Sequence, residues 1–281
     1  MRVRLDVAYD GTDFSGWAVQ PERRTVAGVL LAELEKIAGP GNPTGLTVAG
    51  RTDAGVHATG QVCHVDLPDE RWAALAPTLV RRLAGLLPGD VRVLRAAAVP
   101  PEFDARFSAL WRRYEYRASD AEAGPSPLRR LDTLFWQRRL DLDRLNAAAA
   151  GLCGEHDFAA FCKRKEHATT IRQITAMSWR RDPDGVLVAT VQADAFCQAM
   201  VRSLVGAMLT VGDGRREPDW PASLLTRTER SSDVLVAPPH GLNLVAVGYP
   251  DAAEFAARAE QTRALRGTPA GARPTGPDAE D

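Results

Sequence analysis

The stretch AGRTDAGVHA, residues 49–58, sets an arginine and a carboxylate two positions apart and flanks them with glycines. It follows a strand-like segment over residues 46–49, and side chains two positions apart on an extended chain point to the same side. We therefore expect Arg51 and Asp53 to face the same way, with Gly50 and Gly55 letting the backbone turn tightly beside them. Most aspartates before a small residue and a glycine only shape a turn, so the stretch alone predicts either a turn or a presented catalytic carboxylate.

Around this stretch, the first half of the chain alternates strand-like and helical segments. Residues 3–9 have the composition of a strand, and Thr25 precedes apolar positions that recur at helical spacing, so it is expected to cap a helix. Residues 61–67 alternate apolar and polar side chains, which predicts a strand with one buried face. A second helix is predicted over 79–87 and a further strand over 91–99.

The second half repeats this pattern more loosely. Its predicted elements are a strand over 111–118, a helix over 142–152, a hairpin of strands over 171–179 and 185–193, a long apolar helix over 197–211 and a last strand over 242–247.

These elements predict an α+β fold: two similar α/β halves with mainly antiparallel sheets and an active-site cleft between them. We place the boundary near residue 104, which gives an N-terminal half, 1–104, and a C-terminal half, 105–250. The tail, 251–281, is expected to form a short exposed helix as far as residue 265 and to be dispensable for function. From Arg266 onward it lacks apolar periodicity, which predicts disorder.

The composition is that of a globular protein of about two domains: 281 residues, 45% of them hydrophobic and 25% charged. No apolar segment follows Met1 and no run has the length of a membrane span, so we expect a cytoplasmic protein. The four cysteines, at 63, 153, 162 and 197, lack the spacing of a zinc site. They are expected to be small buried side chains or free thiols in a reducing compartment.

The charge balance by itself argues against a nucleic-acid partner, because the net charge is −1 and such domains often carry a basic excess. The average hides an uneven distribution, since residues 105–180 hold more Arg and Lys than Asp and Glu. A local basic face can bind phosphates even on a neutral protein.

A second informative stretch is FDARFSA, residues 103–109, which leads into the strand at 111–118. Alternation puts Arg112, Tyr114 and Tyr116 on one face of that strand. Basic and aromatic side chains on one surface suit a phosphate backbone and an unstacked base, because a ring can pack on a base. The alternative is an amphipathic strand whose tyrosines cover a core, and the residues alone leave both open.

The helix expected over 197–211 carries a charged residue, Arg202, among apolar neighbours. An unpaired guanidinium is costly to bury. Arg202 is therefore expected either to meet a carboxylate or to extend along the helix to the surface.

Taken together, these stretches resemble the motifs of the tRNA pseudouridine synthase A family, in the family's order, from about residue 3 to residue 250. Residues 49–58 are similar to its catalytic motif, in which the aspartate is essential, so the resemblance gives that role to Asp53. FDARFSA and the Arg-x-Tyr strand resemble its second motif, with Tyr114 as the active-site tyrosine. The run from Met200 is similar to its third motif, whose arginine, here Arg202, pairs with the catalytic aspartate.

Two further stretches resemble the amino-terminal and closing segments of the same family. They are residues 9–26 and the run GLNLVAV, residues 241–247. The first is expected to have a structural role, and a contact with RNA is left open. Asn243 stands where the family has Tyr, and Ser203 where it has Asn, so these departures bear on packing or substrate contacts.

The resemblance implies an isomerase that converts uridine to pseudouridine at tRNA positions 38–40, in the anticodon stem-loop, as a homodimer without a cofactor or metal. Asp53 would attack ribose C1′ or take a proton in an elimination, and an ion pair with Arg202 would keep it charged. Tyr114 would pack on the uracil and assist proton transfer at C5. Arg51 would fill the space left by the flipped base or hold its phosphate, and Arg106 and Arg112 would contact the tRNA.

Two other classes of function would use these residues differently. A non-catalytic RNA-binding protein would not need a carboxylate that faces an anionic ligand. A metal-assisted nuclease or phosphatase would draw on Asp6, Asp10 and Asp13, which lack a convincing ligand pattern. His57 and His64 have no neighbouring nucleophile to activate, so they are expected to be polar turn and strand residues.

Overall fold

The computed structural model describes residues 1–163 and 169–263, in which one ten-stranded sheet carries the helices of both halves. The strands are β1 (Arg2–Tyr9), β2 (Thr44–Val48), β3 (His57–Asp66), β4 (Val91–Val99), β5 (Trp111–Ser119), β6 (Leu134–Phe135), β7 (Gly154–Asp157), β8 (Ile171–Arg181), β9 (Leu187–Ala193) and β10 (Leu242–Gly248). The helices are α1 (Val26–Ala38), α2 (Asp69–Leu75), α3 (Leu79–Leu86), α4 (Leu142–Ala150), α5 (Met200–Gly212), α6 (Trp220–Ser223) and α7 (Phe255–Arg263). No helix among these residues has the length and apolar character that crossing a membrane requires.

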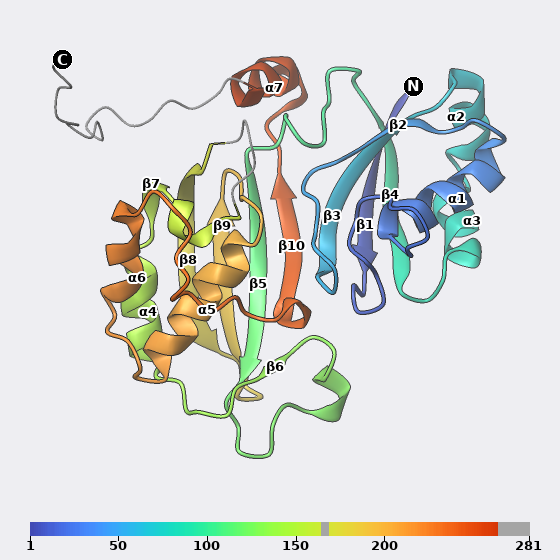
Figure 1. The fold of residues 1–281 in the computed structure, drawn as a ribbon. Helices are drawn as coiled ribbons and strands as arrows, with labels where there is room; N and C mark the ends of the chain where they lie inside the picture. Colours follow the sequence, from blue (N-terminus) through green and yellow to red (C-terminus); the bar gives the residue numbers. More distant parts are fainter. Residues whose placement is uncertain (164–168, 264–281) are drawn as a thin grey trace, which may run out of the picture.

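The two predicted halves are joined edge to edge in this sheet. Its strand order is β4-β1-β3-β10-β5-β9-β8-β7, with β2 added at β3 and β6 at β5. Figure 1 shows β10, the last strand of the chain, between β3 of the first half and β5 of the second. Most pairs are antiparallel, as predicted, but β10 runs parallel to β3 through the pairs Asn243↔His57 and Leu244↔Ala58.

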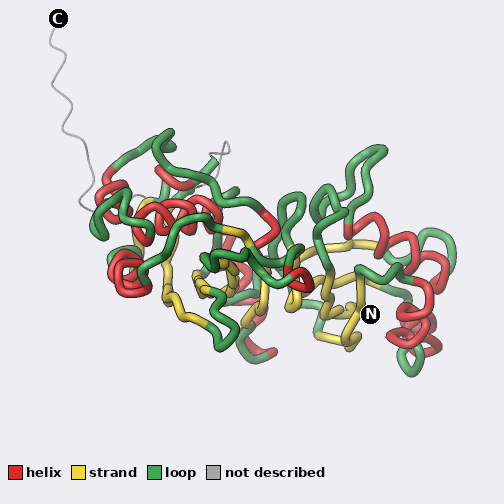
Figure 2. The backbone as a smooth tube through the Cα atoms, turned by 90° about the horizontal axis from the view of Figure 1, so that it is seen from below, coloured by secondary structure: helices red, strands yellow, loops and turns green. Residues whose placement is uncertain are grey.

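The N-terminal half follows the predicted pattern closely. Alternate residues of β1 are buried, and α1 begins where its Thr25 cap accepts a hydrogen bond from the backbone of Gly28. The buried positions of α1 recur at helical spacing and pack into the core beneath the sheet. The helix α2, which the sequence pattern did not indicate, precedes α3. Figure 2 shows the helices of the two halves at opposite ends of the molecule.

The strand β3 departs from the prediction of one buried face, because it is covered on both sides. Cys63 and Val65 enter the main core, as expected. The other face is buried as well: Val62 packs in a second apolar cluster, and His64 accepts a hydrogen bond from the backbone N–H of Ala105 at 3.0 Å. Alternation could not show this, since the covering segment comes from a distant part of the chain.

The C-terminal half contains the predicted hairpin, β8 and β9, with β9 paired to β5. The helices α4, α5 and α6 lie together beside these strands (Figure 1), with α4 packed on both β8 and α5. The helix α5 begins at Met200 rather than near residue 197. Ala199 precedes it with a left-handed φ of 65°, a conformation that a helix interior does not allow.

The tail is more firmly attached than predicted. The expected helix forms as α7, but its Phe255 is buried against Phe103 with ring centroids 5.1 Å apart, and the hydroxyl of Ser108 donates to the carbonyl of Phe255. The part of the tail up to Arg263 therefore completes the second cluster, and it is not dispensable for packing. The disorder predicted from Arg266 lies outside the described residues.

The junction of the halves depends on a glycine. A Cβ at Gly60 of β3 would lie 2.0 Å from the backbone carbonyl oxygen of Val245 in β10. We predict that Gly60→Ala lowers the free energy of unfolding by at least about 2 kcal/mol, because neither backbone can move away without breaking the sheet. Urea unfolding measures this value.

The control is Gly85→Ala in α3, where an added Cβ meets no atom within 4 Å. That change is expected to raise stability by up to about 1 kcal/mol, since alanine favours the helix. Equal stability of the two variants would contradict the assignment of Gly60 to a close strand contact.

Candidate active site

The stretch singled out at the start forms the loop between β2 and β3. Along it exposure alternates: Arg51 is exposed, Thr52 is buried and the side chain of Asp53 is 39% exposed. Arg51 makes no hydrogen bond or ion pair within residues 1–163 and 169–263. The loop thus offers a half-exposed carboxylate and an unengaged cation two residues apart.

The amino-terminal stretch at residues 9–26 holds this loop by its backbone, which confirms the expected structural role. The N–H of Trp17 donates to the carbonyl of Thr52 at 3.1 Å, and the N–H of Gly55 donates to the carbonyl of Phe14 at 3.3 Å. Gly16 has a φ of 93°, and a Cβ there would lie 2.9 Å from the carbonyl oxygen of Thr52. Only glycine accommodates both the conformation and the close approach.

A buried polar network fixes the side of the loop that faces inward. The hydroxyls of Tyr9 and Thr52 lie 2.8 Å apart, and Nε2 of Gln61 donates to the Tyr9 hydroxyl at 3.2 Å and to the carbonyl of Gly50 at 2.8 Å. Burial raises the pKa of Tyr9, which keeps this phenol neutral. Sequence reasoning missed these residues. The available signal was the polar Gln61 at the start of a segment predicted to be a half-buried strand.

His57 connects the end of the loop to both halves of the protein. Its Nδ1 accepts from the N–H of Gly11 at 3.0 Å, and its Nε2 lies 2.9 Å from the carbonyl oxygens of Leu131 and His240. Oδ1 of Asp10 also lies 3.1 Å from Nδ1, so the His57 ring holds three backbone segments and one carboxylate in place. This agrees with the polar turn role expected from the sequence.

Arg202 reaches the loop from the first turn of α5. Its Nη1 lies 3.8 Å from Oδ2 of Asp53, which confirms the predicted ion pair, although at a distance too long for a hydrogen bond. Its Nε donates to the carbonyl of Ala237 at 2.7 Å, while its own carbonyl accepts from the N–H of Ala237 at 3.0 Å. The side chain is 20% exposed, so it emerges from an otherwise buried helix at the site itself.

Tyr114 of β5 lies beside the same loop. Its hydroxyl oxygen is 3.8 Å from the point that a Cβ of Gly50 would occupy, and its ring packs edge-on against Phe196 with centroids 5.1 Å apart. Burial raises the pKa of Tyr114 to about 12, the nearby charge of Asp53 acts in the same direction, and Arg112 opposes it. The phenol is therefore protonated in neutral solution.

Arg112 differs from the expectation of a tRNA contact. The predicted alternation of β5 is correct, but the face that carries Arg112 is turned inward, and this side chain is 6% exposed. Its nitrogens donate to the carbonyls of Ala49, Arg106 and Asp194. Burial leaves it no open side toward a phosphate, so its bonds are those of a structural residue. Arg106, by contrast, has an exposed side chain that lies over the ring of Phe107.

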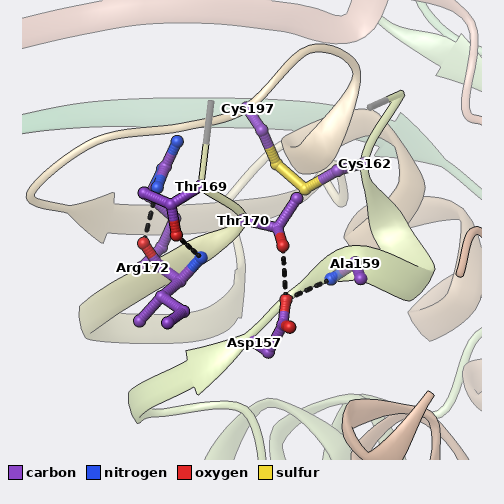
Figure 3. The surroundings of a disulfide bond; sticks show 8 residues. Asp157, Ala159, Cys162, Thr169, Thr170, Arg172 and Cys197 are labelled. Atoms are coloured by element: carbon purple, nitrogen blue, oxygen red, sulfur yellow. Dashed lines mark hydrogen bonds between the residues drawn. A yellow bond between two sulfur atoms is a disulfide. The ribbon is translucent and has the colours of Figure 1, made fainter. Parts of the chain in front are cut away.

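The cysteines also differ from the expectation. Cys63 and Cys153 are free, but Cys162 and Cys197 form a disulfide, where four unpaired cysteines were predicted (Figure 3). The bond joins the segment after β7 to the one that leads into α5. Beside it, the N–H of Lys163 donates to the carbonyl of Gln198 at 3.0 Å. The spacing of the cysteines in the sequence does not predict this disulfide, because Cys162 and Cys197 come together only when their two segments pack.

Two hollows in the surface do not contain these side chains. Cavities of about 470 and 400 Å³ are lined by residues around Arg2 and Arg263 and by residues around Arg139 and Gly212. The candidate site is thus defined by converging side chains at the junction of the halves. Within the described ranges, no group of three or more His, Cys, Asp or Glu side chains is arranged to hold a metal ion.

A family model described as tRNA pseudouridine synthase matches residues 148–250, and relatives that match nearly the whole chain place it among the pseudouridine synthases. Relatives named tRNA pseudouridine synthase A are 57% identical in Streptomyces griseus, covering 96% of this chain and 95% of theirs, and 57% identical in Frankia casuarinae, covering 95% and 96%. One from Mycobacterium leprae is 50% identical, over 95% and 96%. The chain belongs to the tRNA pseudouridine synthase A family and is an isomerase.

The network under the loop can be tested directly. Thr52→Val keeps the shape of the side chain and removes the hydroxyl that meets Tyr9, so we predict that the free energy of unfolding falls by roughly 1–3 kcal/mol. Urea unfolding of the purified variant gives the value. Thr190→Val is the control, because the Thr190 hydroxyl makes no hydrogen bond within the described ranges and should cost little. Equal effects of the two changes would rule out a buried network at Thr52.

Proposed function

We propose that this protein converts uridine to pseudouridine at positions 38–40 of the tRNA anticodon stem-loop, in the cytoplasm and as a homodimer, with Asp53 as the essential carboxylate. The observation that carries the proposal is the Asp53 side chain itself: half-exposed, 3.8 Å from Arg202 and next to the buried ring of Tyr114. Family membership supports tRNA as the substrate class.

The reaction breaks the bond between ribose C1′ and N1 of uracil, turns the base and joins C1′ to C5. The proton on C5 is then lost, and N1 gains a proton, so the product is an isomer of uridine. It needs an ionised carboxylate at the sugar, either as a nucleophile at C1′ or as a base that removes a proton. Asp53 suits both routes. Arg202 pairs with it at 3.8 Å, and partial exposure leaves the carboxylate open to a ribose.

Tyr114 supplies a flat apolar wall for the flipped uracil. Phe196 packs edge-on against its ring, which fixes the plane that a base would meet. Because its pKa is about 12, the phenol of the free enzyme can donate a proton or a hydrogen bond near neutral pH. It can accept the proton from C5 only after its own proton has left.

Two exposed arginines suit the tRNA backbone and the vacated base position. Arg51 has no partner within the described ranges, and Arg106 is anchored through its backbone while its guanidinium is exposed. We propose that Arg51 fills the gap left by the extruded base or holds its phosphate, which would offset part of the cost of unstacking. Arg106 would contact a phosphate nearby.

Asp53→Asn is predicted to abolish turnover and to leave tRNA binding largely unchanged. The amide keeps the size of the side chain but cannot act as a nucleophile or a base. Release of tritium from 5-labelled uridine in tRNA measures turnover, and filter binding measures affinity. Glu70→Gln, which changes an exposed carboxylate in α2, is the control and should retain full activity. Product formation by Asp53→Asn would exclude Asp53 as the catalytic carboxylate.

Mapping pseudouridine in the treated tRNA tests the target positions, and the same reaction with a chelator separates the proposal from metal-assisted cleavage. Loss of activity in the chelator would favour a metal-assisted enzyme. Tight binding of tRNA with no pseudouridine formed would instead favour a non-catalytic RNA-binding protein.

Arg202→Gln is predicted to lower kcat by roughly ten- to a hundredfold, because Asp53 loses the cation that pairs with it and helps to hold its side chain in the site. The KM for tRNA should change less. Arg215→Gln, just beyond the other end of α5, is the control; Arg215 pairs with Asp213 at 2.7 Å and lies outside the site. If both variants kept wild-type kcat, the ion pair would have no part in catalysis.

A further inference from the structure

The side chain of Arg112 is enclosed among three segments that meet at the site. Its Nε and Nη2 donate to the carbonyl of Ala49 at 3.2 and 2.9 Å, and Nη1 donates to the carbonyl of Asp194 at 2.8 Å. Nη2 also donates to the carbonyl of Arg106. All three nitrogens of one guanidinium are therefore bound to backbone oxygens.

Each of these carbonyls belongs to a segment that carries or supports a group proposed for the reaction or for tRNA binding. Ala49 opens the loop that ends in Asp53. Asp194 closes the run from β9 and is followed by Phe196, which packs on the ring of Tyr114. Arg106 belongs to the second stretch and presents its own side chain to solvent.

An arginine is the side chain that can make these bonds together. Its planar guanidinium directs donors along fixed, diverging lines, whereas lysine has one compact ammonium at the end of a flexible stem. Burial lowers the pKa of the Arg112 guanidinium, yet arginine keeps its proton in proteins, so every donor remains available.

We propose that Arg112 is a positioning residue for the isomerisation: its guanidinium sets the Asp53 loop against the Arg106 segment and the segment that leads to Phe196 and α5. The proposal rests on the proposed role of Asp53. This role replaces the phosphate contact that strand alternation suggested for Arg112. The two roles predict a different salt dependence of tRNA binding, because each lost phosphate contact lowers the slope of log affinity against log salt concentration by about 1.

The test compares Arg112→Lys and Arg112→Gln with the same changes at Arg113. Arg113 is the next residue on β5, has an exposed side chain and donates to Gln192. We measure kcat and KM for tRNA by tritium release, the slope of binding between about 50 and 200 mM salt, and amide hydrogen exchange. Urea unfolding identifies variants that are not folded.

We expect both Arg112 variants to fold and kcat to fall roughly ten- to a hundredfold. This is the effect expected when the charge-assisted hydrogen bonds that hold the three segments are removed. KM should stay within about twofold and the salt slope should not change, since all three nitrogens of the Arg112 guanidinium are already bound to backbone carbonyls. Amides in all three anchored segments should exchange faster, while those of β1 do not. The Arg113 variants should keep wild-type kcat.

Wild-type kcat in folded Arg112 variants would overturn the proposal, and so would a salt slope reduced by about 1, which would restore the phosphate contact. Unfolding of both variants would assign Arg112 to overall stability and overturn it as well. Asp53→Asn assayed in parallel separates the two proposals: turnover by that variant refutes the function of Asp53, whereas inactive Asp53→Asn beside fully active Arg112 variants refutes the positioning role alone.

Discussion

The pairing of β10 with β3 is the constraint on which the site depends. Two residue pairs, Asn243↔His57 and Leu244↔Ala58, join the halves in parallel, and the missing side chain of Gly60 lets the two backbones approach. The same strand pairs with β5 on its other edge. The last strand of the chain thus sets the loop of Asp53 a fixed distance from Tyr114, and the segment just before that strand holds Arg202 at Ala237.

Around the reacting groups, much of the buried polarity supports the backbone. Gln61 holds the carbonyl of Gly50, His57 bridges Gly11 to the carbonyls of the other half, and Arg112 binds three carbonyls at once. A loop cannot form the regular ladders of a sheet, so its carbonyls need side-chain donors when they are buried. These donors leave Asp53 and Arg51 as the loop residues whose charged side chains reach the surface and make no hydrogen bond within the described residues.

Local patterns were enough to predict most of the secondary structure, and the family motifs predicted the ion pair of the candidate site. The apolar spacing after Thr25 predicted α1, and strand-like runs predicted β1, β4 and the β8–β9 hairpin. The family motifs brought Asp53, Tyr114 and Arg202 together, and the ion pair of the first and last is present. The predictions that were wrong concerned partners distant in sequence: the second buried face of β3, the packing of Phe255 and the disulfide between Cys162 and Cys197.

The sequence by itself determined which residues carry charge and chemistry, and the local conformation that their neighbours impose. It could not decide which of the two faces of a strand is exposed to solvent. The alternation of side chains in the sequence is the same whether or not a distant segment covers that face. For this reason the sequence did not distinguish Arg112 from Arg106, two basic residues of neighbouring segments, and only the tertiary structure shows that one is buried and the other exposed. Arg112 is enclosed by Ala49, Arg106 and Asp194, which come from three parts of the chain, whereas the side chain of Arg106 stays in water.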